Sequence, residues 1–187
     1  MTEDLQDIKD HVLFATLAEG EEARNAAFQE IYRRYARQLY VYCLKVMPEA
    51  AKAEDIFQET FLRVLRAGRE RREMTNLPAY VMRIARNLCL EQKRFEQKKF
   101  VDLEEIDLSR FDTMSDENEL RNLIDMTLDT LSAEQREAFV LQTFNGMSYS
   151  QIAEVTDVPV STVRNRVVRA KQRVREIVSR YFLEDPK

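Results

Sequence analysis

The stretch that most constrains the fold of this 187-residue chain covers residues 148–175 and reads SYSQIAEVTDVPVSTVRNRVVRAKQRVR. Ser148 followed by Gln151 has the S-x-x-Q spacing of a capping box, in which side-chain and backbone groups satisfy each other at the start of a helix. Pro159 cannot lie inside that helix, and Asp157 tolerates a tight turn, so the helix should end one or two residues before Asp157. A second helix follows at once. The stretch therefore predicts a helix-turn-helix.

The second helix of this stretch carries a strong excess of positive charge. Ser161 is its expected cap, and apolar residues recur every three or four positions to form one buried stripe: Val163, Val167, Ala170, Val174 and Ile177. Between Thr162 and Arg180 there are seven basic residues and one acidic residue, in a chain whose formal net charge is -4. Such a density of charge repels itself unless phosphates neutralise it. The helix is therefore predicted to bind nucleic acid.

Four residues near the start of this helix share a face and have side chains that can read base edges. They are Arg164, Asn165, Val168 and Arg169. Arginine can bond guanine, asparagine can bond adenine, and valine can rest on the methyl group of thymine. The alternative is a solvated basic helix on the surface of an ordinary helical bundle, which would need no DNA.

The composition favours an all-α protein without enzymatic chemistry. Three glycines, four prolines and 33% charged residues are typical of a mostly helical protein, and no strand-like alternation of any length occurs. His11 is the only histidine, and there is no glycine-rich phosphate loop. Cys43 and Cys89 lie in apolar helical patterns and form no metal-ligand pair, which predicts reduced core residues. We therefore expect no catalytic residue, no metal and no cofactor.

The N-terminal segment is acidic, with seven acidic residues and one lysine in residues 1–22. It has neither the basic start of a signal peptide nor a long apolar run. We therefore expect a cytoplasmic protein with no stable membrane insertion. A short helix that contains Leu13 and Leu17 should end near Gly20.

Three longer helices are expected next, over residues 22–47, 51–67 and 78–99. The second of them has one apolar face and another face that mixes acids, amides and bases, including Asp55, Gln58 and Glu59. That polar face is either simply solvated or a docking surface for a partner, and composition does not choose between the two. The third is basic, with six basic and two acidic residues between positions 79 and 99. Two basic helices suggest two contacts with nucleic acid.

A linker should divide the chain into two small helical domains. Residues 101–119 hold eight acidic residues against Arg110 and show no sustained apolar stripe, so self-repulsion should keep this segment extended. We expect a first domain over residues 1–97, an acidic linker over 98–119 and a second domain over 120–187. The second domain should contain about four helices, two of which form the helix-turn-helix.

In this order the motifs resemble those of the extracytoplasmic-function (ECF) bacterial RNA polymerase sigma factors, the small type that contains sigma region 2 and sigma region 4. The segment EDIFQETFLRVLR at 54–66 resembles the family's helix that binds core polymerase. The segment PAYVMRIARNLCLEQKR at 78–94 resembles its helix for promoter melting and minus-ten recognition. The segment at 131–174, from LSAEQ to AKQRV, resembles the domain that reads the minus-thirty-five element.

The resemblance assigns roles to individual residues. It implies that the polymerase's clamp coiled coil meets the helix face of Asp55, Gln58, Glu59 and Phe61. It implies that the minus-ten element lies against Arg83, Arg86 and Asn87, and that the loop over residues 68–76 captures a base extruded from the non-template strand. Thr162 joins Arg164, Asn165 and Arg169 at the major-groove positions.

The resemblance also implies the partners: core RNA polymerase, promoter DNA and an anti-sigma factor that covers the same surfaces. Two other functions are to be distinguished from a sigma factor. An autonomous helix-turn-helix regulator would bind DNA tightly without polymerase and would not need Asp55 or Gln58. A purely structural helical adaptor would not lose function when Arg169 is replaced by alanine.

Overall fold

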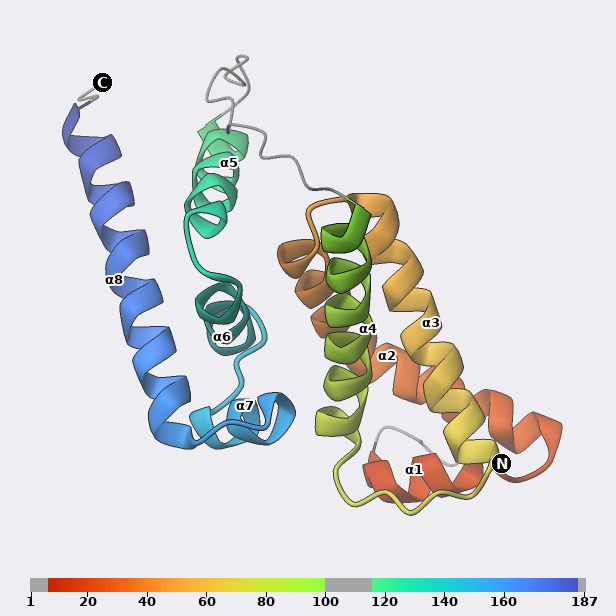
Figure 1. Cartoon of the computed structure of the whole chain (residues 1–187). Helices are drawn as coiled ribbons and strands as arrows, with labels where there is room; N and C mark the ends of the chain where they lie inside the picture. Colours follow the sequence, from red (N-terminus) through yellow and green to blue (C-terminus); the bar gives the residue numbers. More distant parts are fainter. Residues whose placement is uncertain (1–6, 100–115, 185–187) are drawn as a thin grey trace.

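The structure, a computed structural model, describes residues 7–99 and 116–184, which form eight helices and no strand (Figure 1). The all-α prediction is confirmed for this part of the chain. In chain order the helices are α1 (Asp10–Thr16), α2 (Glu21–Val46), α3 (Ala50–Arg69), α4 (Leu77–Lys99), α5 (Asp116–Asp129), α6 (Ala133–Thr143), α7 (Tyr149–Thr156) and α8 (Val160–Glu184).

Helices α2, α3 and α4 pack side by side, and α1 lies across one end of them (Figure 1). Each helix contributes an apolar stripe to a shared core, because residues three and four apart fall on one face. Fully buried members of this core include Leu13, Ile31, Leu39, Val64 and Val81. Burial of such side chains stabilises the fold by about 1.5–3 kcal/mol each.

Helix α1 is fixed to the bundle at two places. Its Asp10 carboxylate accepts a hydrogen bond from Arg34 of α2 over 2.8 Å. After α1, Leu17 presses against Gly68 of α3, where an added Cβ would lie only 2.5 Å from the Leu17 side chain. Glycine at position 68 therefore permits the close approach of the two segments.

A buried carboxylate supports the same attachment. Glu30 is 6% exposed and accepts hydrogen bonds from Arg33 over 2.7 and 2.8 Å and from Arg34 over 2.7 Å. The hydrogen bonds and charges of Arg33 and Arg34 outweigh burial and lower the pKa of Glu30 from 4.5 to about 2. Glu30 thus holds Arg34 in the position from which it reaches Asp10 of α1.

Replacing Glu30 by glutamine is expected to lower the free energy of unfolding at pH 7 by on the order of 2 kcal/mol, because charged hydrogen bonds to two arginines are lost. A lowered pKa in the folded state stabilises the protein above the unfolded value of 4.5, and this contribution falls as pH drops toward 2. Thermal unfolding of both proteins between pH 7 and pH 3 checks this. A stability difference that stays constant over that range would contradict the assignment.

The sequence predicts the cap residue of three helices in the second domain, which consists of α5 to α8. Two of these three predictions are confirmed. Both S-x-x-Q motifs form capping boxes: the hydroxyl of Ser132 accepts from Gln135 N, and that of Ser148 accepts from Gln151 N. The third expectation is wrong, because α8 begins at Val160, directly after Pro159, so Ser161 lies inside the helix rather than at its cap. Proline is well accommodated next to a helix start, where its missing N–H has no partner to lose.

The segments between the domains differ slightly from expectation. α4 continues to Lys99 and α5 begins at Asp116, so both helices extend into the predicted linker over 98–119. Residues 100–115 of that linker lie outside the described residues. In the first domain α3 runs on through Gly68 to Arg69, two residues beyond the expected break.

Cys43 and Cys89 are both free and buried, and their hydrogen bond, together with burial, raises the pKa of the Cys43 thiol.

Candidate nucleic-acid interface

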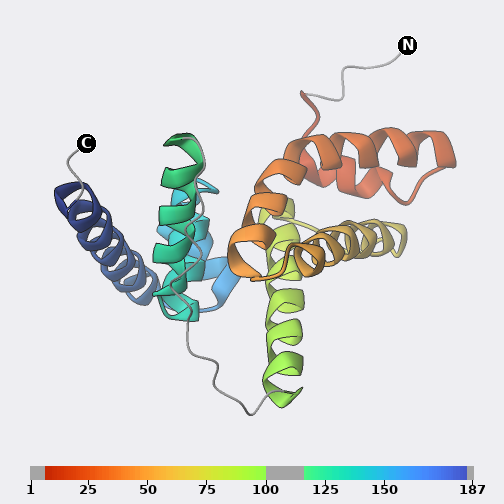
Figure 2. The ribbon, with the colours of Figure 1, turned by 90° about the horizontal axis from the view of Figure 1, so that it is seen from above.

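The helix-turn-helix predicted from residues 148–175 is present as α7, a tight turn and α8. The turn depends on Asp157, which adopts a left-handed backbone with φ 56° directly after α7. Aspartate tolerates this conformation better than most residues, and the position is the usual one for ending a helix. The turn directs α8 away from α7 and leaves α8 along the side of the second domain that faces away from the first domain (Figures 1 and 2).

One side of α8 is buried and the opposite side is free. Val163, Val167 and Ala170 are at most 1% exposed and pack in the core of the second domain. Arg164, Asn165 and Arg169 are exposed, as is Val168 at 53%, whereas Thr162 is half-buried. The side chains of these arginines and of this asparagine make no hydrogen bond or ion pair with any other residue in the described ranges. The predicted base-reading residues therefore form one accessible face.

The second predicted DNA surface, on α4, is not free in this structure. Arg83 donates from Nη2 to the backbone oxygen of Glu154 over 2.8 Å. Arg86 donates from Nε to Glu137 Oε1 over 3.0 Å. Of the three predicted minus-ten residues only Asn87 is exposed without a described partner. The second domain thus occupies two of the side chains assigned to promoter DNA.

Glu137 is the centre of this contact between the domains. It lies on α6, is 7% exposed, and also accepts a hydrogen bond from the hydroxyl of Tyr42 over 3.0 Å. Burial and the neighbouring carboxylate raise the pKa of Tyr42, so its hydroxyl stays protonated and donates. A buried carboxylate needs such partners, because an unpaired charge in a low-dielectric interior is costly.

Further polar contacts surround this centre. Asn76 of the loop before α4 donates from Nδ2 to Glu154 Oε2 over 2.9 Å. Asn145 donates from Nδ2 to the backbone oxygen of Gln38 over 2.7 Å. Arg136 donates to the backbone oxygen of Lys45 over 2.6 Å, and Lys45 forms an ion pair with Asp125. α2 and α4 are thereby joined to the second domain through groups that sequence reasoning did not identify.

The predicted polymerase-binding face lies on α3. Asp55 and Gln58 are exposed, and Glu59 forms an ion pair with Arg63 over 2.7 Å with about two fifths of each side chain exposed. Phe61 differs from expectation, because it is only 4% exposed. Its ring packs in an aromatic cluster with Phe28, Tyr32 and Phe57. Phe61 therefore supports this surface from below and does not itself face a partner here.

Exposed apolar side chains complete that face. Tyr32 is 44% exposed, Tyr40 37% and Leu62 53%. Tyr32 and Tyr40 both meet Phe57 edge-on, at ring-centroid distances of 5.9 and 5.5 Å. Aromatic residues with an accessible polar tip are enriched where proteins meet. The exposure of both tyrosines on α2 is a finding of the structure.

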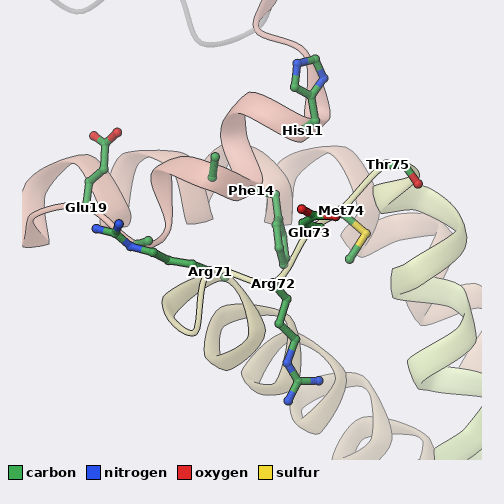
Figure 3. A pocket seen from close by; sticks show the side chains of 11 residues that line it. His11, Phe14, Glu19, Arg71, Arg72, Glu73, Met74 and Thr75 are labelled. Carbon is green, nitrogen blue, oxygen red and sulfur yellow. The ribbon is translucent and has the colours of Figure 1, made fainter.

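A pocket of about 580 Å³ opens beside the loop between α3 and α4 (Figure 3). The loop contributes Arg71, Arg72, Glu73, Met74 and Thr75. The other wall comes from α1 and the turn after it, which the sequence did not connect with this loop. Arg71 has a left-handed backbone with φ 54°. Residues whose backbone is held in such a conformation cluster at functional sites.

The described residues show neither a group of metal ligands nor a membrane-spanning helix. In residues 7–99 and 116–184 no group of three or more His, Cys, Asp or Glu side chains is arranged to hold a metal ion. None of the described helices combines the length and the apolar character needed to cross a membrane.

Comparisons with known families match both halves of the chain. Residues 31–99 match Sigma-70 region 2, and residues 121–174 match Sigma-70, region 4. ECF RNA polymerase sigma factor SigE of Mycolicibacterium smegmatis is 28% identical over 174 residues, which cover 89% of this chain and 67% of that protein. RNA polymerase sigma factor CarQ of Myxococcus xanthus is 29% identical over 162 residues, with 84% and 92% covered.

Solved structures give the same relationship. The sigma factor RpoE in complex with the anti-sigma factor NepR, from Bartonella quintana, is 26% identical and aligns with a TM-score of 0.66 over 81% of this chain and 96% of that chain. CnrH in complex with the cytosolic domain of CnrY aligns with a TM-score of 0.65 over 91% and 97%, and at 23% identity it shows the fold alone.

Proposed function

Because the chain belongs to the extracytoplasmic-function branch of the sigma-70 family and is an RNA polymerase sigma factor, we propose that its three surfaces divide the work of promoter recognition. Sigma factors of this family are initiation factors without enzymatic activity, and they bind core RNA polymerase and promoter DNA. An autonomous regulator is not favoured, because the family matches extend over both halves of the chain. We place the protein in the cytoplasm, where its polymerase and promoters are.

The observation that carries the proposal is the free face of α8. Its arginines and asparagine are exposed beside Val168, an apolar side chain that is 53% accessible. That combination matches the donors, acceptors and methyl groups of a major groove. Thr162, Arg164, Asn165 and Arg169 would read the minus-thirty-five element, with Val168 against a thymine methyl group.

The remaining roles follow the residues predicted on α3 and α4. The α3 face with Asp55, Gln58 and Glu59 would dock on the polymerase, with Tyr32 and Leu62 as accessible apolar neighbours. Arg83, Arg86 and Asn87 would meet the minus-ten element, and the loop over residues 68–76 would capture an extruded base. The proposed domains are residues 1–97 and 120–187, joined by a linker over 98–119.

The docked arrangement implies an opening step before the minus-ten element can be bound. Arg83 and Arg86 cannot contact DNA phosphates or bases while Glu154 and Glu137 hold them. The two domains must therefore separate when polymerase and promoter engage. An anti-sigma factor is the expected antagonist, as the related RpoE forms a complex with the anti-sigma factor NepR.

Run-off transcription tests the function directly. Core RNA polymerase is incubated with fragments of the host genome, with and without this protein, and the new transcripts are mapped. Transcripts that start at a common pair of upstream elements only when the protein is present would support the proposal. If no transcript depends on the protein, while it binds duplex DNA tightly alone, the autonomous regulator becomes the better account.

Base reading by α8 gives a sharper expectation. Replacing Arg169 by alanine should cost about 1–3 kcal/mol in binding the preferred upstream element and should relax base choice at one position. Arg175, exposed further along α8, serves as the control, because its replacement should weaken binding to all sequences alike. Binding of holoenzyme that contains each variant to a library of upstream elements measures the loss of affinity and the change in base choice. Equal weakening on every sequence for Arg169→Ala would refute base reading by this residue.

A further inference from the structure

The pocket beside the loop between α3 and α4 has a second wall that belongs to α1 and the turn after it. The residues of this wall are His11, Phe14, Ala15, Ala18 and Glu19. They follow the helical spacing of three and four residues, so they share one face of α1 and its last turn. Figure 3 shows His11 and Glu19 of this face with Arg71, Arg72 and Glu73 of the loop below them.

The side chains of this wall are arranged as a trough. Ala15 and Ala18 lie between His11 and Glu19 in the sequence and also line the pocket. Figure 3 shows the His11 and Glu19 side chains well apart along this wall. Beneath them Phe14 is only 2% exposed and meets Tyr80 of α4 edge-on at a centroid distance of 6.1 Å. Small residues between two larger polar ones leave room for a flat ligand.

Four of the polar side chains that line this pocket are not used by the fold. The side chains of His11 and Glu19, and those of Arg71 and Glu73 across the pocket, make no hydrogen bond or ion pair with another residue that the structure describes. Arg72 is different, because it forms an ion pair with Glu70 over 2.8 Å and turns away from α1 in Figure 3. The pocket therefore offers one arginine as a donor, two carboxylates as acceptors and an imidazole.

The wall is held in place before any ligand arrives. Leu17 fits against Gly68 so closely that an added Cβ would collide with it. The ion pair between Asp10 and Arg34 fixes the start of α1. On the loop side, Arg71 N bonds to Gly68 O over 3.0 Å and fixes the turn. A pocket with rigid walls loses little conformational freedom on binding.

We propose that this face of α1 is the second wall of the pocket that holds the base extruded from the minus-ten element, and that His11 and Glu19 determine which base is held. The inference rests on the proposed function, in which the loop over residues 68–76 captures that base. Carboxylates only accept hydrogen bonds, so Glu19 and Glu73 favour bases with an exocyclic amino group. Thymine carries no exocyclic amino group and should be the most weakly bound base.

The test uses holoenzyme assembled from core polymerase and the full chain, with a forked promoter whose non-template minus-ten strand is single. Abasic nucleotides are placed at each position in turn, and binding is measured. Removal of one base is expected to weaken binding about tenfold. Ala15→Leu, which fills the trough with a good helix former, should weaken binding to the intact fork by a similar factor. It should have no further effect on the fork that lacks the captured base.

Val12→Leu is the matched control, since Val12 lies on α1, is 43% exposed and does not line the pocket. Glu19→Gln provides a second variant that does not depend on packing, and it should reduce the preference for amino-bearing bases over thymine at the captured position. If both variants leave binding and base preference unchanged, the α1 wall is overturned while capture by the loop stands. If no position responds to removal of its base, the proposed base capture itself fails.

Discussion

Replacing Asp55 by arginine is expected to abolish transcription that depends on this protein while leaving its free energy of unfolding within about 0.5 kcal/mol. Asp55 is exposed on α3, and its side chain makes no hydrogen bond or ion pair with another described residue, so the fold loses no side-chain contact of this kind. On the proposed docking face, however, the reversed charge would be repelled by a partner surface that is complementary to a carboxylate, which costs several kcal/mol. Pull-down of core polymerase and run-off transcription measure the effect.

Glu54→Arg is the matched control for this charge reversal. Glu54 is also exposed on α3, but it lies about 100° around the helix from Asp55. Glu54→Arg should reduce polymerase association far less than Asp55→Arg. If Asp55→Arg protein still binds polymerase as tightly as the unaltered chain, the α3 face is not the docking surface.

The second large effect is expected at Glu137. Replacing this residue by alanine leaves Arg86 and the Tyr42 hydroxyl without their partner at the contact between the domains. Loss of one member of a buried pair costs about 3–5 kcal/mol in the docked state, whereas the separated domains would expose both groups to water. The equilibrium should therefore shift toward separated domains, and small-angle scattering should show a larger radius of gyration.

Three further variants sharpen this test. Tyr42→Phe removes a single hydrogen bond and should cost about 1 kcal/mol, so its effect should be smaller. Glu137→Gln keeps an acceptor for the Tyr42 hydroxyl but loses the charge pair with Arg86. Its increase in radius of gyration should lie between those of Tyr42→Phe and Glu137→Ala. Glu176→Gln changes an exposed carboxylate on α8, whose contacts are with Gln172 and Arg173 of the same helix, and should leave the scattering curve unchanged. If the curve of Glu137→Ala coincides with that of the unaltered protein, this contact does not hold the domains together.

The helices could be predicted from the sequence because their signals are local. Ser148 and Gln151 lie three residues apart, and so do Ser132 and Gln135; both pairs form the expected capping boxes. Asp157 marks the turn through its own backbone preference. The face of α8 follows from the 3.6-residue period alone, so the residues predicted to read bases share an accessible side as expected.

The contact between the domains could not be predicted in this way. Arg86 and Glu137 are 51 positions apart, and Tyr42 and Glu137 are 95 apart, so no periodicity connects them. The available signal was Glu137 itself, a carboxylate within the apolar run of α6 that would need a partner if buried. The wall of α1 beside the loop was missed for the same reason, because the fold alone brings residues 11–19 to residues 68–75.

The position of α8 has a consequence for the order in which promoter elements are met. α8 lies on the side of the second domain that is far from the first domain (Figure 2), and Arg164, Asn165, Val168 and Arg169 are exposed on it in the docked arrangement. If Arg83 and Arg86 bind the minus-ten element as proposed, only molecules with separated domains can bind it, and the apparent affinity for that element is reduced by the fraction of such molecules. Upstream recognition carries no such penalty. The upstream element should therefore act as a tether that raises the local concentration of the downstream site before the domains part.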